Sequence, residues 1–308
     1  MAKSVFTGIC RTRTRGVGEM PSLNKHSENE QVERDGGADR ELPPFDTTVA
    51  SQARVWNYWL GGKDHFASDR EASEKVLAAM PSLLQIARAS RRFLADAVTL
   101  LARDYGIRQF LDIGTGLPTA DNTHEVAQRA APESRVVYVD NDPVVLLHAR
   151  TLLTSTPPSV TDYIQADLRE PDTILAGAAA TLDFARPVAI TLLGVLHFVG
   201  GDEAYQIVDR LLDAVPPGSY LAVTHATLDP AFGGEAAVEA NAAMNQMWNN
   251  SSPTPITPRS REQVARFFRG LQMVEPGLVS MSRWRPEPGS SQDEPAEVMG
   301  FGCVGRKP

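Results

Sequence analysis

Cysteine and long apolar stretches are scarce in this 308-residue sequence. Its two cysteines, Cys10 and Cys303, stand near opposite ends of the chain, so we expect neither a disulfide framework nor a cysteine-rich zinc site. The longest apolar run begins at Pro187 and falls short of the ~20 residues that a membrane-spanning helix needs. The N-terminus also lacks the pattern of a signal peptide. These absences predict a cytoplasmic protein without a membrane partner.

Basic residues are not in excess either. The formal net charge is −8 and the pI is near 5.3, which disfavours a broad phosphate-binding surface, so we expect no nucleic-acid partner. Histidines and carboxylates show no spacing that indicates a metal site. Contents of 42% hydrophobic and 22% charged residues are typical of a soluble globular protein, and the length fits one large domain or two ordinary ones. None of these properties predicts an oligomeric state.

The chain divides by pattern into three segments. Residues 1–45 lack hydrophobic periodicity and cannot bury enough apolar surface to offset their ordering entropy, so they are predicted to be a disordered tail. Residues 46–106 have a helical pattern and are predicted to form an N-terminal helical cap. Residues 107–308 alternate strand-like and helical runs, which predicts an α/β core with a parallel sheet covered on both faces. The last two strand-like runs, GLVSMSRW and EVMGFGCVGR, are expected to pair as a hairpin at the sheet edge.

Signals for helix ends are present in the predicted cap. Gly61 can end the first helix in a left-handed conformation, and Gly106 can end the third helix in the same way. Ser68 and Glu71 fit a capping box that would open the second helix.

The strongest candidate for a binding site is the run FLDIGTGLPTADNTHE. A predicted strand ends at Asp112, and the turn Gly114-Thr115-Gly116 follows, where glycine permits a tight turn and a close approach to a ligand. The turn leads into a helix that Asn122 and Glu125 could cap, and whose N-terminal N–H groups could bind a ligand. A purely structural turn would also explain the two glycines.

Two later strand ends make the site more specific. Asp140 ends the next strand, 24 residues beyond Gly116, where a carboxylate can accept hydrogen bonds from ribose hydroxyls; Asn141 follows it. The third strand ends at Asp167 and Leu168, which can present a carboxylate and a backbone N–H to an adenine edge. Because parallel strands end at one edge of a sheet, these residues should lie together.

The same run favours S-adenosylmethionine over NAD as the cofactor. Thr119 stands where a dinucleotide motif has its third glycine or alanine. Asp112 would repel a pyrophosphate but would suit the α-ammonium of a methionine moiety. The pattern G-x-x-x-x-G-K-[ST] is absent, which excludes a P-loop.

Together these motifs resemble a known family. The segments RVWNYWLGGKDHFASDREA, FLDIGTGLPTADNTHEVAQ, VVYVDNDPVVL and QADLREP are similar to those of an S-adenosylmethionine-dependent methyltransferase family typical of actinomycetes, once a domain of unknown function. The resemblance covers roughly residues 46–307. It implies a Rossmann-like class I methyltransferase fold, with a seven-stranded sheet whose last strand is antiparallel, and it leaves the methyl acceptor unidentified. Carried onto this sequence, the cofactor motifs fall on Asp112, Gly114, Gly116, Asp140 and Asp167.

Candidates for the catalytic group are few. Methyl transfer from a sulfonium is an in-line displacement in which positioning can contribute ~7–11 kcal/mol, and a base is needed only when the acceptor arrives protonated. His197, at the end of the predicted fourth strand, is the best candidate base, and a local hydrogen bond that caps the strand end is the equal alternative. His225 in the next strand is more typical of a core histidine. The N/D-P-P-Y/F/W motif of methyltransferases that act on adenine or glutamine is absent.

The segment RVWNYWLGGKDHF is predicted to be a lid over the cofactor cleft. Trp56, Tyr58 and Trp59 cannot share one helical face, so one aromatic can anchor the helix while Tyr58 faces the cleft. Gly62 then allows a tight turn that brings His65, a second candidate catalytic residue, to the methionine end of the cofactor. In the alternative, the aromatic side chains only cement a helical cap.

The leading interpretation is an S-adenosylmethionine-dependent methyltransferase that modifies O, N or C of an unidentified small molecule. A helical run with Met244, Met247 and Trp248 could contact this acceptor, although such side chains usually belong to a core. The alternative is a cofactor-binding sensor or partner-binding protein without transferase activity, because no residue is an unambiguous catalytic base. An NAD-dependent oxidoreductase is disfavoured by Asp112 and Thr119.

Overall fold

The structure is a computed structural model that describes residues 46–118, 121–145, 147, 161–251, 254–285 and 296–308. The predicted tail, residues 1–45, lies outside the described residues, and so does Thr119. Residues 42–308 form one compact unit. None of the helices described combines the length and the apolar character that a bilayer crossing requires.

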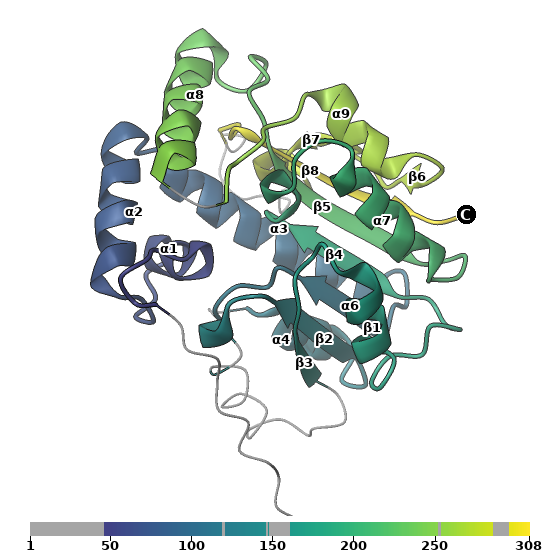
Figure 1. Ribbon diagram of the computed structural model, residues 1–308. Helices are drawn as coiled ribbons and strands as arrows, with labels where there is room; N and C mark the ends of the chain where they lie inside the picture. The colour runs from purple at the N-terminus through teal and green to yellow at the C-terminus, as the bar shows by residue number, and fades with distance from the viewer. Residues whose placement is uncertain (1–45, 119–120, 146, 148–160, 252–253, 286–295) are drawn as a thin grey trace, which may run out of the picture. The chain divides into compact units, whose positions relative to one another are not determined.

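A single sheet organises the core (Figure 1). Its strand order is β3-β2-β1-β4-β5-β8-β6, and β7 pairs with β8 beside that path. Strands β1 to β5 are parallel, whereas β8 runs antiparallel to both β5 and β6. The strands are β1 (Gln109–Ile113), β2 (Arg135–Asp140), β3 (Thr161–Gln165), β4 (Ala189–Leu193), β5 (Tyr220–Ala226), β6 (Gln272–Met273), β7 (Val279–Ser280) and β8 (Gly300–Arg306).

The predicted α/β fold with an antiparallel last strand is confirmed. The described residues contain eight strands rather than seven, because the two-residue β7 adds to β8. The two final strand-like runs pair antiparallel as expected, with Val279 opposite Gly302. However, β8 does not lie at the sheet edge, because β5 and β6 pair with it on either side.

Helices cover both faces of the sheet, with α3 and α4 on one face and α6 and α7 on the other (Figure 1). Successive residues of β1 point to opposite faces of the sheet. Phe110 packs in the apolar cluster with side chains of α3 and α4, whereas Leu111 packs in the cluster with side chains of α6 and α7. The helices are α1 (Gln52–Trp59), α2 (Ala67–Ala79), α3 (Leu83–Arg103), α4 (Thr123–Ala130), α6 (Pro171–Ala178), α7 (Glu203–Asp213), α8 (Gly234–Ser251) and α9 (Arg261–Ala265), with the short 3-10 helix η1 (Leu196–Phe198) after β4.

The helical cap consists of α1, α2 and α8 rather than of residues 46–106 alone. Val55 of α1 and Val76 of α2 share an apolar cluster with Met244 and Trp248 of α8. In contrast, Phe93 of α3 is buried in the cluster under the sheet. The third predicted helix therefore joins the cap to the core, because Leu83 at its start packs in the cap cluster, and α8 from far along the chain adds to the cap.

Most predicted helix ends are present. Gly61 and Gly106 both adopt positive φ, at 79° and 69°, as expected for glycines after a helix. The N–H of Asn122 donates to the Glu125 carboxylate at 2.8 Å, as the predicted capping box requires. The predicted box of Ser68 and Glu71 is wrong, because α2 begins two residues earlier and Asp69 accepts the N–H of Phe66 at 2.7 Å.

Candidate functional site

Asp112 anchors the loop that follows β1. Its side chain is buried, and its carboxylate accepts hydroxyl hydrogen bonds of 2.6 Å from both Thr123 at the start of α4 and Thr191 of β4. Thr115 lies at 3.4 Å from the same carboxylate. Burial is the largest influence on this acid and raises its pKa, while the hydroxyl donors act in the opposite direction. Asp112 therefore joins β1, β4 and α4 directly beneath the glycine turn.

Both glycines of this turn adopt positive φ, which favours glycine, and Gly114 is also required by packing. Gly114 has φ 75°, and a Cβ there would lie 2.6 Å from the Val195 side chain in the loop after β4. Gly116 has φ 66°, but a Cβ there would meet no atom within 4 Å. Gly114 thus permits close packing, whereas Gly116 borders open space at the carboxyl edge of the sheet.

Asp140 connects the glycine turn to the end of β2. Its carboxylate accepts the N–H of Gly116 at 2.7 Å and the N–H of Asp142 at 2.9 Å. Desolvation raises the pKa of Asp140 to about 6, even though both backbone donors favour its ionised form. The predicted proximity of the first two strand ends is therefore observed, and Asn141 lies beside them.

The end of β3 reaches the same edge. The Asn141 side-chain amide donates to the Asp167 carboxylate at 3.3 Å. Arg169, which the sequence analysis did not single out, forms an ion pair with Asp167 at 3.3 Å and donates to the Phe198 carbonyl at 2.9 Å. Leu168 is buried among core side chains, so only its backbone is available to a ligand.

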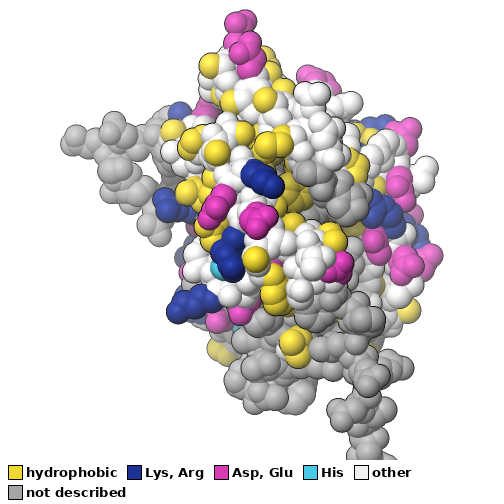
Figure 2. Space-filling model, turned by 60° about the vertical axis from the view of Figure 1, so that its left-hand side comes forward, with side chains coloured by type: hydrophobic (Ala, Val, Ile, Leu, Met, Phe, Trp, Pro, Cys, Tyr) yellow, Lys and Arg dark blue, Asp and Glu magenta, His cyan; other side chains and the backbone are white. Residues whose placement is uncertain are grey.

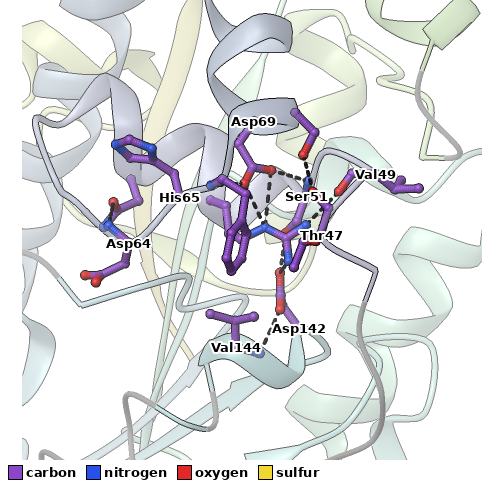
Figure 3. Close-up of polar contacts among 12 residues, drawn as sticks. Thr47, Val49, Ser51, Asp64, His65, Asp69, Asp142 and Val144 are labelled. Carbon is purple, nitrogen blue, oxygen red and sulfur yellow. Dashed lines mark hydrogen bonds and ion pairs between the residues drawn. The ribbon is translucent and has the colours of Figure 1, made fainter.

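A buried polar cluster joins the cap to the end of β2 (Figure 3). Arg54 of α1 donates through Nε to Asp69 of α2 at 3.0 Å, and its Nη1 lies 3.8 Å from Asp142 Oδ2. The Ser51 hydroxyl donates to the Asp142 carboxylate, and the Ser51 N–H donates to Asp69 at 2.9 Å. Asp142 also accepts the N–H of Val144 and so caps the helical turn that begins at residue 143.

This cluster was not predicted from the sequence. Arg54 and Asp69 are almost completely buried, with side-chain exposures of 4% and 0%. The sequence shows only that Arg54 and Asp69 lie in a helical segment. That they are buried and form a pair depends on how α1 packs against α2. The cluster places the cap directly against the loop that carries Asp140.

The predicted lid residues lie elsewhere in the cap. The Tyr58 ring packs edge-on against His65 at 5.0 Å, and its hydroxyl donates to Glu74 of α2 at 3.4 Å. His65 also lies 3.3 Å from an Arg70 nitrogen. A Cβ on Gly62 would lie 2.3 Å from the Asn57 side chain, so this glycine is required by packing within the cap.

The expectation that Tyr58 faces the cofactor cleft stays a prediction, although its ring does not line the cavity under the cap. Gln52, Trp56 and Trp59 line this cavity, and Tyr58 is not among its lining residues. The reason is helical geometry: positions 52, 56 and 59 share one face of α1, while position 58 faces α2.

The cavity lies between the cap and the ends of β4 and β5 and measures about 90 Å³. Helices α1, α3 and α8, the η1 turn and the end of β5 contribute its walls. Met244 and Trp248 of α8 are lining residues, as the sequence had suggested for an acceptor site, whereas Met247 is not one of them. Among the described residues that line the cavity there is no Asp, Glu, Lys or Arg.

The side chains of His197 and His225 lie side by side in the lining of this cavity. Their rings are 5.7 Å apart. Arg259 donates to His225 Nε2 at 2.8 Å, and His225 Nδ1 lies 2.8 Å from the Ala226 carbonyl, so His225 is the neutral tautomer with its proton on Nδ1. Burial first, and then the Arg259 charge, lowers the pKa of His197 to about 3.

Arg259 itself holds the η1 turn. This buried guanidinium donates to the carbonyls of Leu196 at 3.1 Å and Val199 at 2.8 Å, and it lies 5.4 Å from the ring centre of Tyr205. The cation thus fixes the backbone around His197. The sequence analysis missed this residue because its partners lie about 60 positions earlier in the chain.

No cluster of metal ligands is found in the part of the chain that the structure describes. On the face shown in Figure 2, basic and acidic side chains are intermixed with hydrophobic ones. That face therefore shows no broad patch of a single sign among the described residues.

These features define a Rossmann-like α/β protein with a cofactor-type glycine turn and an adjoining apolar cavity. A family profile described as S-adenosyl methyltransferase matches residues 38–308. The chain belongs to this family, whose members use S-adenosylmethionine, so the resemblance read from the sequence motifs is confirmed.

Two solved structures are similar over most of the chain. A DUF574 family protein from Streptomyces avermitilis is 42% identical with a TM-score of 0.79, and the match covers 85% of this chain and 99% of that one. A protein from Thermobifida fusca, a methyltransferase by name, is 38% identical with a TM-score of 0.78, covering 85% and 96%.

Curated relatives match more weakly. A Mycobacterium avium protein named as an S-adenosyl-L-methionine-dependent methyltransferase is 24% identical over 65% of this chain. The match covers 64% of that relative and 47% of another from Mycobacterium sp. strain KMS, so the chain spans between about half and just under two thirds of these relatives.

Proposed function

We propose that this chain transfers the methyl group of S-adenosylmethionine to a small-molecule acceptor. The observation that supports the proposal most is that a polar turn and an apolar cavity lie next to each other. A glycine turn bonded to Asp140 lies at the carboxyl edge of the sheet, and an uncharged cavity lies beside it under the cap. Membership of the methyltransferase family supports this division into a cofactor site and an acceptor site.

The residues at the sheet edge fit the cofactor. Open space at Gly116 leaves room for a ligand against the turn, and the Asp140 carboxylate can accept hydrogen bonds from ribose hydroxyls. Asp167, oriented by Arg169 and Asn141, can accept from the adenine amino group, and the Leu168 N–H can donate to the ring. Asp112 lies beneath the turn near the expected position of the methionine ammonium, where its carboxyl oxygens accept from Thr123 and Thr191. Tyr58, Gly62 and His65 are left out of this assignment because they pack within the cap.

When bound, the cofactor would supply an electrophilic methyl group on a sulfonium. The chain's own contribution is mainly to orient the acceptor and to exclude water, because an in-line displacement depends on alignment. His197, with a pKa of about 3, is neutral at ordinary pH and is suited to hydrogen bonding with the acceptor rather than to removing a proton beforehand. The buried Arg259 holds the backbone on either side of His197 through the carbonyls of Leu196 and Val199.

Calorimetry tests the cofactor half of the proposal. S-adenosylmethionine should bind with a micromolar dissociation constant, near −8 kcal/mol, and NAD should bind far more weakly. Asp140→Ala should lose roughly 1.5–3 kcal/mol of this affinity, because bonds to a charged group are removed. Glu133→Ala is the matched control, since this exposed acid pairs with Arg108 near the start of β2, away from the carboxyl edge. Stronger binding of NAD would end the proposal.

A transfer assay separates an enzyme from a cofactor-binding sensor. The protein is incubated with methyl-labelled S-adenosylmethionine and fractionated metabolite extract, and label is sought in each fraction. Label in a small-molecule fraction supports transfer. Tight cofactor binding with no labelled product in any fraction would support the sensor.

A further inference from the structure

The cavity under the cap is unusual for its lack of ionised groups. Among the described lining residues, the only titratable side chains are those of His197 and His225. Both histidines are held neutral: burial lowers the pKa of His197 and of His225, and Arg259 opposes a positive charge on each of them. A charged ligand would therefore lose its hydration without gaining a counter-ion.

The walls are aromatic and thioether side chains. Trp56 and Trp59 form an edge-to-face pair with ring centres 5.5 Å apart, so they present two differently oriented ring surfaces. Methionines line the cavity from four separate places in the chain, and such side chains adapt to irregular ligands. A volume of about 90 Å³ is of the order of the ~150 Å³ cavities that hold one benzene ring.

Polar atoms without partners occur on the same lining residues. Gln52 Nε2, Trp59 Nε1 and His197 Nδ1 are buried and make no hydrogen bond within the described part of the chain. Gln52 Nε2 and Trp59 Nε1 are donors only. Buried polar groups of this kind need a partner, so a ligand that brings oxygen atoms would satisfy them.

We infer that the methyl acceptor is a small uncharged aromatic hydroxy compound, methylated on its oxygen. The inference rests on the proposed function. Aliphatic amines are excluded because they are protonated near neutral pH and would meet no carboxylate among the described lining residues, and carboxylates are excluded because no cation lines the cavity. A phenol fits both the ring surfaces and the donors, and its hydroxyl is far more acidic than that of an aliphatic alcohol.

The reaction balances without a further reactant. An oxygen lone pair of the phenol forms the new bond to the methyl carbon, the carbon–sulfur bond breaks, and its electron pair returns to sulfur to give a neutral thioether. The O–H electron pair stays on oxygen as the proton passes to the His197 imidazole and then to water. An oxygen that carries both an aryl and a methyl group holds its proton much more weakly than imidazolium does, so a histidine of low basicity can accept it.

Competing probes of one size test the inference on the full chain. With the cofactor site saturated by S-adenosylhomocysteine, 4-methylphenol, benzylamine and benzoate are titrated while tryptophan fluorescence is recorded, since Trp56, Trp59 and Trp248 line the cavity. We expect 4-methylphenol to bind at least tenfold more tightly than either charged probe. With methyl-labelled S-adenosylmethionine and a panel of small phenols, label should appear on the phenolic oxygen. The inference would be overturned by any of three results. These are equal or tighter binding of benzylamine or benzoate, label on nitrogen or carboxylate, and no labelled phenol in the panel.

Two variants tie these results to the cavity. Trp56→Ala should raise KM for the labelled phenol tenfold or more and leave the affinity for S-adenosylhomocysteine within twofold. Asn245→Asp places a carboxylate in the wall and should shift binding from 4-methylphenol towards benzylamine. If neither variant alters the probe preference while both keep the wild-type melting temperature, the acceptor binds elsewhere. Failure of S-adenosylhomocysteine to bind would instead refute the proposed function itself.

Discussion

Removing the buried charge of Arg54 should loosen the cap and weaken cofactor binding together. In Arg54→Met, the side chain keeps its apolar stem, but Asp69 loses its ion-pair partner in a site where it has no exposed surface. Breaking a buried pair in this way typically costs about 3–5 kcal/mol. Asp69 keeps the backbone donors of Ser51 and Phe66, so we expect the lower end, about 3 kcal/mol.

The expected consequence is measurable by thermal unfolding and calorimetry. A loss of about 3 kcal/mol corresponds to a fall of about 6–12 °C in Tm for a domain of this size. Cofactor affinity should also fall, because Arg54 and Ser51 hold Asp142 beside Asp140. The double variant Arg54→Met with Asp69→Asn should recover part of the lost stability, since no buried charge is then left unpaired at this pair.

Arg210→Met is the matched control. Arg210 pairs with Asp172 at 2.7 Å, but both side chains are about half or more exposed, so its loss should barely shift Tm. If Arg54→Met melts like wild type and binds S-adenosylmethionine equally well, the cap is not held through this cluster and the reasoning is refuted.

Two further results are expected. Affinity for S-adenosylmethionine should be highest near neutral pH and decline as the pH falls through about 6, because the pKa of Asp140 lies near that value and protonation removes its charge as an acceptor for ribose hydroxyls. Calorimetry across pH measures this, and an Asp140→Asn profile that still falls near pH 6 would assign the titration to another group. Gly114→Ala should lower both Tm and cofactor affinity, since its Cβ would lie 2.6 Å from Val195 at φ 75°. Unchanged values for both quantities would show that the β4 loop moves aside at no cost.

The meeting of the first three strand ends at one edge of the sheet could be predicted because its signals are local. A strand that runs into Gly114 and Gly116, followed by an acid at the end of the next strand, is fixed by short stretches of sequence and by the shared edge of parallel strands. The same regularity predicted the parallel sheet, whereas the antiparallel last strand was implied by the resemblance to the methyltransferase family. These features depend on nearest neighbours in the chain or in the sheet.

The cap could not be predicted to the same depth. Helical geometry shows that Trp56, Tyr58 and Trp59 cannot share a face, but which face meets the cavity depends on α8, more than 170 residues later. The pairing of Arg54 with Asp69 depends in the same way on the packing of α1 against α2. Packing between distant segments depends on how much apolar surface the whole chain buries, and no single motif determines that amount.

We propose that one edge of the sheet holds S-adenosylmethionine while the neighbouring cavity holds the acceptor. The most direct test is a crystal structure of the full chain with S-adenosylhomocysteine. We expect ribose hydroxyls within hydrogen-bond distance of Asp140, the adenine beside Asp167 and Leu168, and the sulfur directed towards the cavity lined by Trp56 and His197. A cofactor bound away from Asp140, or one that fills the cavity with its adenine, would contradict it.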